Sequence, residues 1–319
     1  MRRRLLLAAG LLALGMRAAR AEDPPPAGPK HFTLVPAGDG VYAAIAKDGD
    51  PAALGNAGFV VGTDAVLVVD TFATVAAAEE LAYEIRKVTP LPVRFVVNTH
   101  YHYDHVGGDA AFTRIGAVVV AHENERAWVR TENLKWRKEI TAEDREMLAH
   151  LVLPDVTYRD GLTIWLGDRR VDVFSRPGHT GGDSVVFVPS ARVLFGGDLF
   201  WRETVPNLID ASTEAWVNTL DGFLQSYPSA TFVPGHGEVG RALEVRFFRD
   251  YLFGLRMSVA RILAEGKSGK DLVDALLPLQ RARYGTWKWF DGFAERNIEL
   301  TEAEIKGTKK LPKPPAPSP

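Results

Sequence analysis

His100-Tyr101-His102-Tyr103-Asp104-His105 places four side chains of metal-binding type within six residues. The preceding residues 92–99 read as a buried strand, because they begin with a proline and are rich in β-branched and aromatic side chains. Gly107 and Gly108 follow, so the motif is expected on a loop at a strand end. Imidazole and carboxylate groups suit Zn²⁺. The alternative is a solvated polar loop, but three histidines and an acid between an apolar strand and a glycine pair have no packing use.

Three further ligand-type residues each follow an apolar run and sit among glycines, and they are His179, Asp198 and His236. Their contexts are Arg176-Pro177-Gly178-His179-Thr180-Gly181-Gly182-Asp183-Ser184, Val193-Leu194-Phe195-Gly196-Gly197-Asp198 and Phe232-Val233-Pro234-Gly235-His236. Glycine beside a ligand lets the backbone approach an ion, and open α/β sheets bind ligands outside their strand ends. Taken alone, an aspartate in a glycine-rich turn is more often an Asx-turn residue. The recurrence of the pattern favours a shared metal site.

The order of these motifs resembles the metallo-β-lactamase superfamily of zinc hydrolases: H-x-H-x-D-H, then His in P-G-H-T, Asp in G-G-D and His in P-G-H-G. The resemblance covers roughly residues 35–250, and residues 56–71 look like the first hairpin of that family. It implies an α/β fold, an αββα sandwich of two mixed β-sheets flanked by helices. Strand-like runs at 58–70, 92–99, 117–121, 162–174, 185–195 and 230–234 fit this expectation.

Carried over by position, the resemblance assigns ligands to two zinc ions. The first ion would be held by His100, His102 and His179. The second would be held by Asp104, His105 and His236. Asp198 would bridge both. Asp70, at a strand end, would orient one ligand imidazole by accepting its second N–H, although a plain turn residue is the alternative.

The chain contains no cysteine, and this sets it apart from part of the family. One lactamase subclass uses cysteine as a zinc ligand and another lacks a bridging acid, so Asp198 fits neither. The ligand set resembles instead the broader branch of glyoxalase II-type thioesterases, lactonases, phosphodiesterases and quinoprotein-relay zinc hydrolases. A β-lactamase proper remains an alternative.

The resemblance implies hydrolysis of a carbonyl bond in an ester, thioester, lactone or β-lactam by a hydroxide generated on the two zinc ions. Asp104, as a ligand, is also a candidate proton relay and the expected catalytic residue. Two other classes stay open. An iron-dependent oxygenase like the persulfide dioxygenases shares the first motif, but seven ligands suit two metals. A non-catalytic metal-binding scaffold usually lacks a ligand, and none is missing here.

The N-terminus is predicted to be a secretory signal peptide, residues 1–21, because three arginines precede a short apolar run and an Ala19-Arg20-Ala21 cleavage site. A membrane anchor or a twin-arginine signal are the alternatives, yet the apolar run is short for a span. From this signal peptide we expect a periplasmic or secreted hydrolase that is not stably inserted in a membrane after processing. Removing the leader takes away five arginines and changes the formal charge from −2 to about −7.

The mature chain shows no basic stripe, so a small-molecule substrate is expected and no nucleic acid. We expect a disordered linker at 22–34, one hydrolase domain at 35–305 and a proline-rich disordered tail at 306–319. Helices are predicted at 74–88 with Thr74 as N-cap, 215–227 and 238–265.

Two segments are candidates for the substrate pocket. Residues 123–153 are charged and amphipathic, and form either a lid or a surface helix packed through its tryptophans. The lid would present Trp128, Arg130, Trp136 and Arg137. Directly after Asp198, the side chains of Trp201, Arg202 and Asn207 could orient a substrate.

Overall fold

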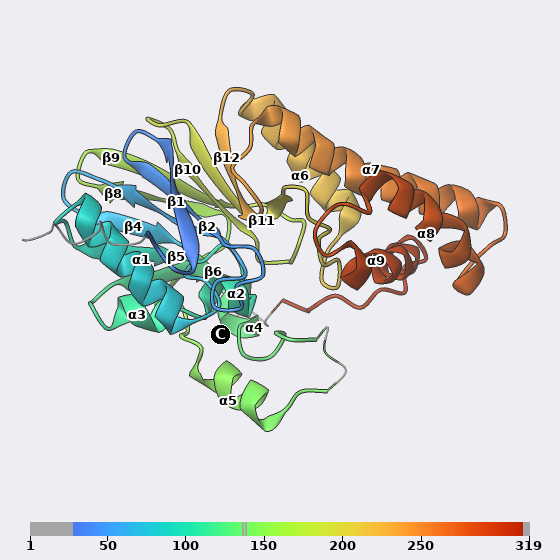
Figure 1. Ribbon diagram of the computed structural model, residues 1–319, viewed down its shortest axis with the longest axis horizontal. Helices are drawn as coiled ribbons and strands as arrows, with labels where there is room; N and C mark the ends of the chain where they lie inside the picture. The colour runs from blue at the N-terminus through green and yellow to red at the C-terminus, as the bar shows by residue number, and fades with distance from the viewer. Residues whose placement is uncertain (1–27, 136, 138, 315–319) are drawn as a thin grey trace, which may run out of the picture.

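Two β-sheets pack face to face in the left part of the molecule as drawn in Figure 1. The computed structural model describes residues 28–135, 137 and 139–314, so the predicted signal peptide and Trp136 lie outside it. Within this part, the first sheet has the order β1-β2-β3-β4-β5-β6-β7 and the second the order β12-β11-β10-β9-β8. Helices cover the outer faces, and the predicted αββα sandwich is confirmed.

The first sheet is formed by β1 (Phe32–Gly38), β2 (Val41–Ala46), β3 (Ala57–Val61), β4 (Val66–Val69), β5 (Val93–Val97), β6 (Val118–His122) and β7 (Val156–Tyr158). The second is formed by β8 (Gly161–Leu166), β9 (Arg169–Ser175), β10 (Ser184–Val188), β11 (Val193–Trp201) and β12 (Thr231–His236). The helices are α1 (Val75–Val88), α2 (Tyr103–Val106), α3 (Asp109–Thr113), α4 (Glu123–Trp128), α5 (Ala142–His150), α6 (Thr213–Ser226), α7 (Ala242–Ala264), α8 (Lys270–Tyr284) and α9 (Phe290–Ile305).

Parallel pairing decides where the motif loops meet. Strands β4, β5 and β6 run parallel, as do β11 and β12, so their carboxyl ends lie at one edge of each sheet. All four residues of β4 are buried, as expected of a parallel strand that is covered on both faces. Val69 and Val97 face the second sheet, whereas Val68 and Val96 pack beneath α1. Because side chains alternate along each strand, the two faces of the first sheet contribute to two separate hydrophobic cores.

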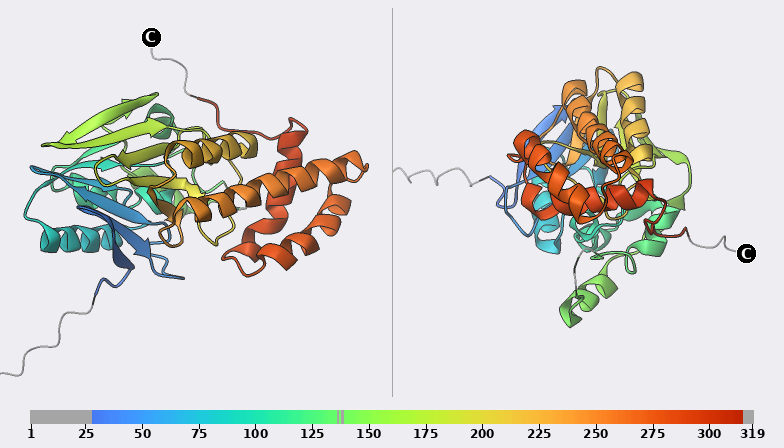
Figure 2. Two further views of the ribbon diagram at one scale, coloured as in Figure 1. Left: turned by 90° about the horizontal axis from the view of Figure 1, so that it is seen from above. Right: turned by 90° about the vertical axis from the view of Figure 1, so that its right-hand side faces the viewer.

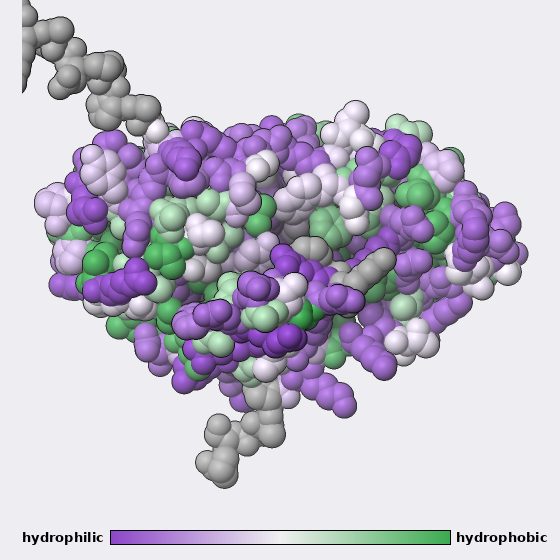
Figure 3. All heavy atoms as spheres, turned by 60° about the horizontal axis from the view of Figure 1, so that its bottom comes forward, coloured by the Kyte–Doolittle hydropathy of each residue, from purple (hydrophilic) through white to green (hydrophobic). Residues whose placement is uncertain are grey.

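The predicted helix start at Thr74 is confirmed, because its hydroxyl accepts a hydrogen bond from the backbone N–H of Ala77. The helix predicted at 238–265 is α7, and its apolar face lies against the second sheet beside α6. Helices α8 and α9 continue from α7 at one end of the molecule, away from β1 and β4 (Figures 1 and 2). None of the helices in the described ranges is both long and apolar enough to cross a bilayer. On the face drawn in Figure 3, hydrophilic side chains predominate.

Three of the predicted strand-like runs each fold as a hairpin of two strands. The run 58–70 contains β3 and β4, 162–174 contains β8 and β9, and 185–195 contains β10 and the start of β11. Turns at Gly167 (φ 65°) and Arg192 (φ 52°) reverse the chain in the last two. Strands β1, β2 and β7 were not predicted from the sequence.

The structure corrects the inner boundaries of the two segments predicted to be disordered, residues 22–34 and 306–319. Strand β1 begins inside the predicted 22–34 linker, and its first residue, Phe32, is fully buried. The segment after α9, predicted as a disordered tail, runs back toward α4 (Figure 1). There the indole N–H of Trp128 donates to the Lys313 carbonyl at 3.0 Å, and the Lys309 ammonium donates to the carbonyl of Leu208 at 2.6 Å. Proline content alone could not reveal these tertiary hydrogen bonds.

Candidate metal centre

The sequence motifs converge at the carboxyl ends of the parallel strands. Residues 100–105 form the loop after β5 and the short helix α2, and His179 lies in the loop between β9 and β10. Asp198 lies within β11, just after a bulge at Gly197 (φ 49°), and His236 is the last residue of β12. All seven predicted ligands are thereby brought into two adjacent groups.

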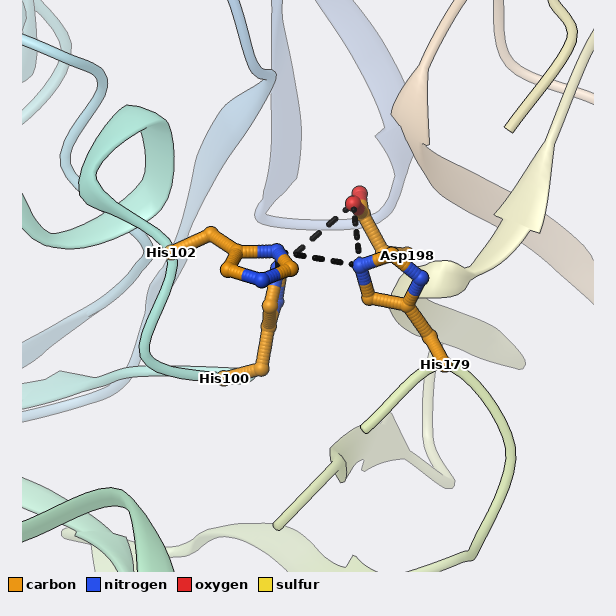
Figure 4. Close-up of side chains that lie close together, drawn as sticks. All are labelled: His100, His102, His179 and Asp198. Carbon is orange, nitrogen blue, oxygen red and sulfur yellow. Dashed lines mark hydrogen bonds and ion pairs between the residues drawn. The ribbon is translucent and has the colours of Figure 1, made fainter. Parts of the chain in front are cut away.

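The first group contains His100, His102, His179 and Asp198, whose ligand atoms all lie within 4.8 Å of one another (Figure 4). The Nδ1 atom of His102 is 3.0 Å from Nε2 of His100 and 3.0 Å from Nε2 of His179. The Oδ2 atom of Asp198 is 3.1 Å from Nε2 of His179. His102 therefore points its Nδ1 atom into the group, whereas His100 and His179 point their Nε2 atoms into it.

The second group contains Asp104, His105 and His236. Nε2 of His105 is 3.4 Å from Nε2 of His236, and Oδ2 of Asp104 is 3.4 Å from the latter. Asp198 turns its other oxygen toward this group, since its Oδ1 is 3.2 Å from His105 Nε2 and 3.3 Å from His236 Nε2. One carboxylate thus faces both groups, one oxygen to each, which is the arrangement expected of a bridging ligand.

Buried carboxylates contact the far sides of the imidazoles. Asp70, predicted to orient a ligand, accepts from His105 Nδ1 at 3.0 Å and from the backbone N–H and hydroxyl of Thr99 at 2.7 Å each. Burial raises the pKa of Asp70, and these donors oppose that shift. Asp210, which sequence reasoning missed, lies 3.8 Å from Nε2 of His102 and accepts from the Tyr101 hydroxyl at 2.6 Å. The two acids favour the tautomers in which the inward nitrogens carry lone pairs.

The loop that carries His179 is held by Asp183, a residue inside the quoted motif. Its carboxylate accepts from the backbone N–H of Thr180 at 2.7 Å and from the Thr180 hydroxyl at 2.6 Å. This local pair closes the Thr180-Gly181-Gly182-Asp183 turn and fixes the backbone next to the ligand.

The donor set fits two divalent cations of borderline softness. The Nδ1 atom of His102 lies 3.0 Å from a ring nitrogen of both His100 and His179. Asp198 Oδ1 is a buried oxygen without a hydrogen-bond donor in the described residues. Burial alone would raise the pKa of Asp198, but His236, His105 and His100 outweigh it and hold that pKa well below its usual value. Burial also lowers the pKa of His100 well below its usual value, which favours the neutral form that ligates metals. A Cβ at Gly235 would lie 1.9 Å from Asp198 Oδ1, so only glycine leaves room for the carboxylate.

A cavity of about 400 Å³ opens over both groups. Its lining includes Trp201 and Asn207, two of the predicted pocket residues. Arg202, the third, does not line it, because its guanidinium donates to the Val239 carbonyl and faces a separate cavity. The remaining walls come from Asn133, in the predicted lid segment, and from residues that the sequence did not predict, which are Leu54, Tyr103, Trp289, Gly292 and Phe293.

The predicted lid segment folds as α4, α5 and their connection. Trp128 is buried and lies 5.8 Å from the ring of Tyr101, which agrees with the packing alternative. Arg130 donates to the Leu151 carbonyl, and Arg137 pairs with Asp144. From this segment, Asn133 reaches the cavity, while Trp136 lies outside the described residues.

A family model described as the metallo-beta-lactamase superfamily matches residues 51–236. The chain belongs to this superfamily. The match contains all seven candidate ligands and ends before α7, so α7, α8 and α9 lie beyond it.

Relatives within the superfamily carry different activities in their names. The chain is 26% identical over 275 residues to a linear primary-alkylsulfatase of Pseudomonas sp. (strain ATCC 19151), covering 70% of this chain but only 52% of the relative. It is 28% identical over 209 residues to a metallo-beta-lactamase type 2 of Pseudomonas aeruginosa, covering 62% of this chain and 74% of the relative. An acyl-coenzyme A thioesterase of Homo sapiens is 26% identical over 183 residues, with 51% and 64% covered.

A solved metallo-beta-lactamase from Pontibacter korlensis superposes with a TM-score of 0.58 at 24% identity, covering 70% of this chain and 99% of that chain. This likeness concerns the fold alone. Since the relatives include a sulfatase, a lactamase and a thioesterase, the branch expected from the sequence stays a prediction.

Proposed function

We propose that this superfamily member is a dinuclear zinc hydrolase that cleaves a carbonyl bond in an ester, thioester, lactone or β-lactam. The observation that carries the proposal is the pair of ligand groups joined by Asp198 at the floor of an open cavity. When bound there, two zinc ions would supply an activated water and a Lewis acid for the substrate carbonyl oxygen.

The protein's own residues would position and protonate the reactants. His100, His102 and His179 would hold one ion, and Asp104, His105 and His236 the other. Asp104 is the most accessible of the ligand carboxylates, with 17% of its side chain exposed and its oxygens at the cavity. It is therefore placed to take a proton from the attacking water and pass it to the leaving group.

The proposal includes the cellular location expected from the sequence. Residues 1–21 would be removed on export, and the mature hydrolase would act in the periplasm or outside the cell. Sequencing the N-terminus of the protein secreted from its host would test this part: a first residue at Glu22 supports it, and an intact Met1 contradicts it.

A substrate panel tests the reaction class. Purified zinc-loaded protein should hydrolyse at least one carboxylic ester, thioester, lactone, penicillin or carbapenem, and His102→Ala should remove most of that activity. Exposed Trp165 provides a matched control, since it lies on the edge strand β8 and does not line the cavity over the ligands. Turnover of a linear alkyl sulfate without any carbonyl substrate, or full activity in His102→Ala, would contradict the proposal.

A further inference from the structure

The α8–α9 connection forms one wall of the cavity over the ligands. Trp289, Gly292 and Phe293 come from this connection and the first turn of α9, and they face Leu54 and Tyr103. The Trp289 ring lies 4.8 Å from the ring of His236 and 5.6 Å from that of Trp201. A segment beyond the family match therefore shapes the space that a substrate must enter.

Trp289 is held in a costly backbone conformation. Its φ is 61°, in the left-handed region that a bulky L-residue adopts only under constraint from its surroundings. The constraint is visible: the Lys288 N–H donates to the Glu203 carbonyl and the Val205 N–H to the Lys288 carbonyl, each at 2.9 Å. Because Trp289 is 38% exposed, core burial does not account for this placement. The strained backbone instead holds the indole beside the His236 and Trp201 rings in the cavity wall.

Apart from the ligands, the cavity lining in the described ranges carries no charged side chain. Among the described residues that line it, none is Lys or Arg, and the carboxylates present are the ligands Asp104 and Asp198. Tyr103, Asn133 and Asn207 add uncharged polar groups. A second anionic group on a substrate would find no cationic side chain to pair with, whereas an apolar chain would be desolvated against Leu54, Trp289 and Phe293.

We infer that this wall makes the enzyme selective for substrates with an uncharged, apolar acyl chain. The inference rests on the proposed function. In the reaction, the oxygen of water bonds to the acyl carbon, the bond from that carbon to the leaving oxygen or sulfur breaks, and the leaving group takes a proton. A carboxylic acid and an alcohol or thiol are the products.

Gly292 offers a substitution that fills the wall without disturbing the fold. A Cβ there meets no atom within 4 Å, and Gly292 lies within a helix, where leucine is the better helix former. Gly254 on α7 is the matched control, since it too is a helical glycine with open space, and it does not line the cavity. Both leucine variants should therefore fold.

The test measures kcat/KM of zinc-loaded protein on p-nitrophenyl acetate, butanoate, hexanoate and octanoate, and on the anionic p-nitrophenyl glutarate. In the wild type, kcat/KM should rise by up to about fourfold per buried methylene and should be at least about tenfold lower on glutarate than on hexanoate. Gly292→Leu should reduce the octanoate-to-acetate ratio by at least about tenfold, and Gly254→Leu should leave it unchanged. No chain-length dependence, a preference for glutarate, or the same ratio in Gly292→Leu would overturn the inference while leaving the hydrolase intact.

A binding readout separates this inference from the reaction itself. Octanamide is a neutral, stable analogue, and its binding can be followed by calorimetry. It should bind the wild type at least about tenfold tighter than butanamide, and Gly292→Leu should remove that difference. If no ester is turned over but this binding pattern holds, the proposed function fails and the apolar acyl site stands. Equal binding of the two amides overturns the inference whether or not esters are hydrolysed.

Discussion

Asp70→Asn should lower the zinc affinity of the Asp104, His105 and His236 group by about 10- to 100-fold, because it disturbs the tautomer of His105. Oδ2 of Asp70 accepts two hydrogen bonds, one from His105 Nδ1 at 3.0 Å and one from the Thr99 hydroxyl at 2.7 Å. If the amide nitrogen takes the place of Oδ1, it opposes the backbone N–H of Thr99; if it takes the place of Oδ2, it cannot accept from His105. The ring must then lose the hydrogen bond or move its proton to Nε2, the nitrogen that faces His236.

The magnitude follows from that contact. A hydrogen bond to a charged, buried acceptor contributes about 1.5–3 kcal/mol, which corresponds to roughly 10- to 150-fold in a binding constant. The other group should be less affected, because its imidazoles do not contact Asp70 directly. Titration with a competing chromophoric chelator should therefore remove one of two zinc ions from Asp70→Asn at chelator concentrations that leave the wild type loaded.

Asp50→Asn is the matched control, since Asp50 accepts from His31 Nδ1 at 2.9 Å and neither residue belongs to the ligand groups. The same carboxylate-to-amide change there should leave both zinc affinities unaltered. Wild-type affinity at both positions in a folded Asp70→Asn protein would refute the role assigned to Asp70.

Further substitutions test burial and close packing. Burial raises the pKa of Asp109 to about 7, so the folded protein binds this proton more tightly than the unfolded chain. Its stabilising contribution, at most about 4 kcal/mol, is full below about pH 4 and is lost as pH rises through about 7. The melting temperature of Asp109→Asn relative to wild type should thus increase from pH 5 to pH 8, and a constant difference would count against this assignment. Gly235→Ala should displace the Asp198 carboxylate and reduce bound metal by at least half in elemental analysis. The control Gly254→Ala should keep its metal and stabilise the protein by about 0.5–1 kcal/mol. Normal metal content in Gly235→Ala would show that the carboxylate can shift.

The ligand positions could be predicted from the sequence because each is tied to a local pattern. His102 and Asp104 stand in one short motif after an apolar strand, and His236 follows Pro234-Gly235 at the end of another. Parallel strands then bring these ends to one edge without any long-range information about side chains. Asp70 was predicted only through the resemblance to the family, which has an acid at this strand end.

The cavity walls could not be predicted, since they depend on packing between distant segments. Trp289 lies in a connection without a motif, and Asp210 reaches His102 across more than a hundred residues of sequence. Trp201 and Arg202 illustrate the same limit at short range. Adjacent residues in extended backbone point to opposite sides, so only one of the two could face the metal groups, and the sequence did not show which.

Metal stoichiometry, measured by elemental mass spectrometry together with chelator-reversible hydrolysis on the same sample, tests the central claim most directly. Two zinc ions per chain, with activity lost on chelation and restored by added zinc, is the predicted result. One iron per chain, or hydrolysis that persists after all metal has been removed, would contradict a dinuclear zinc centre built on Asp198 and its six partners.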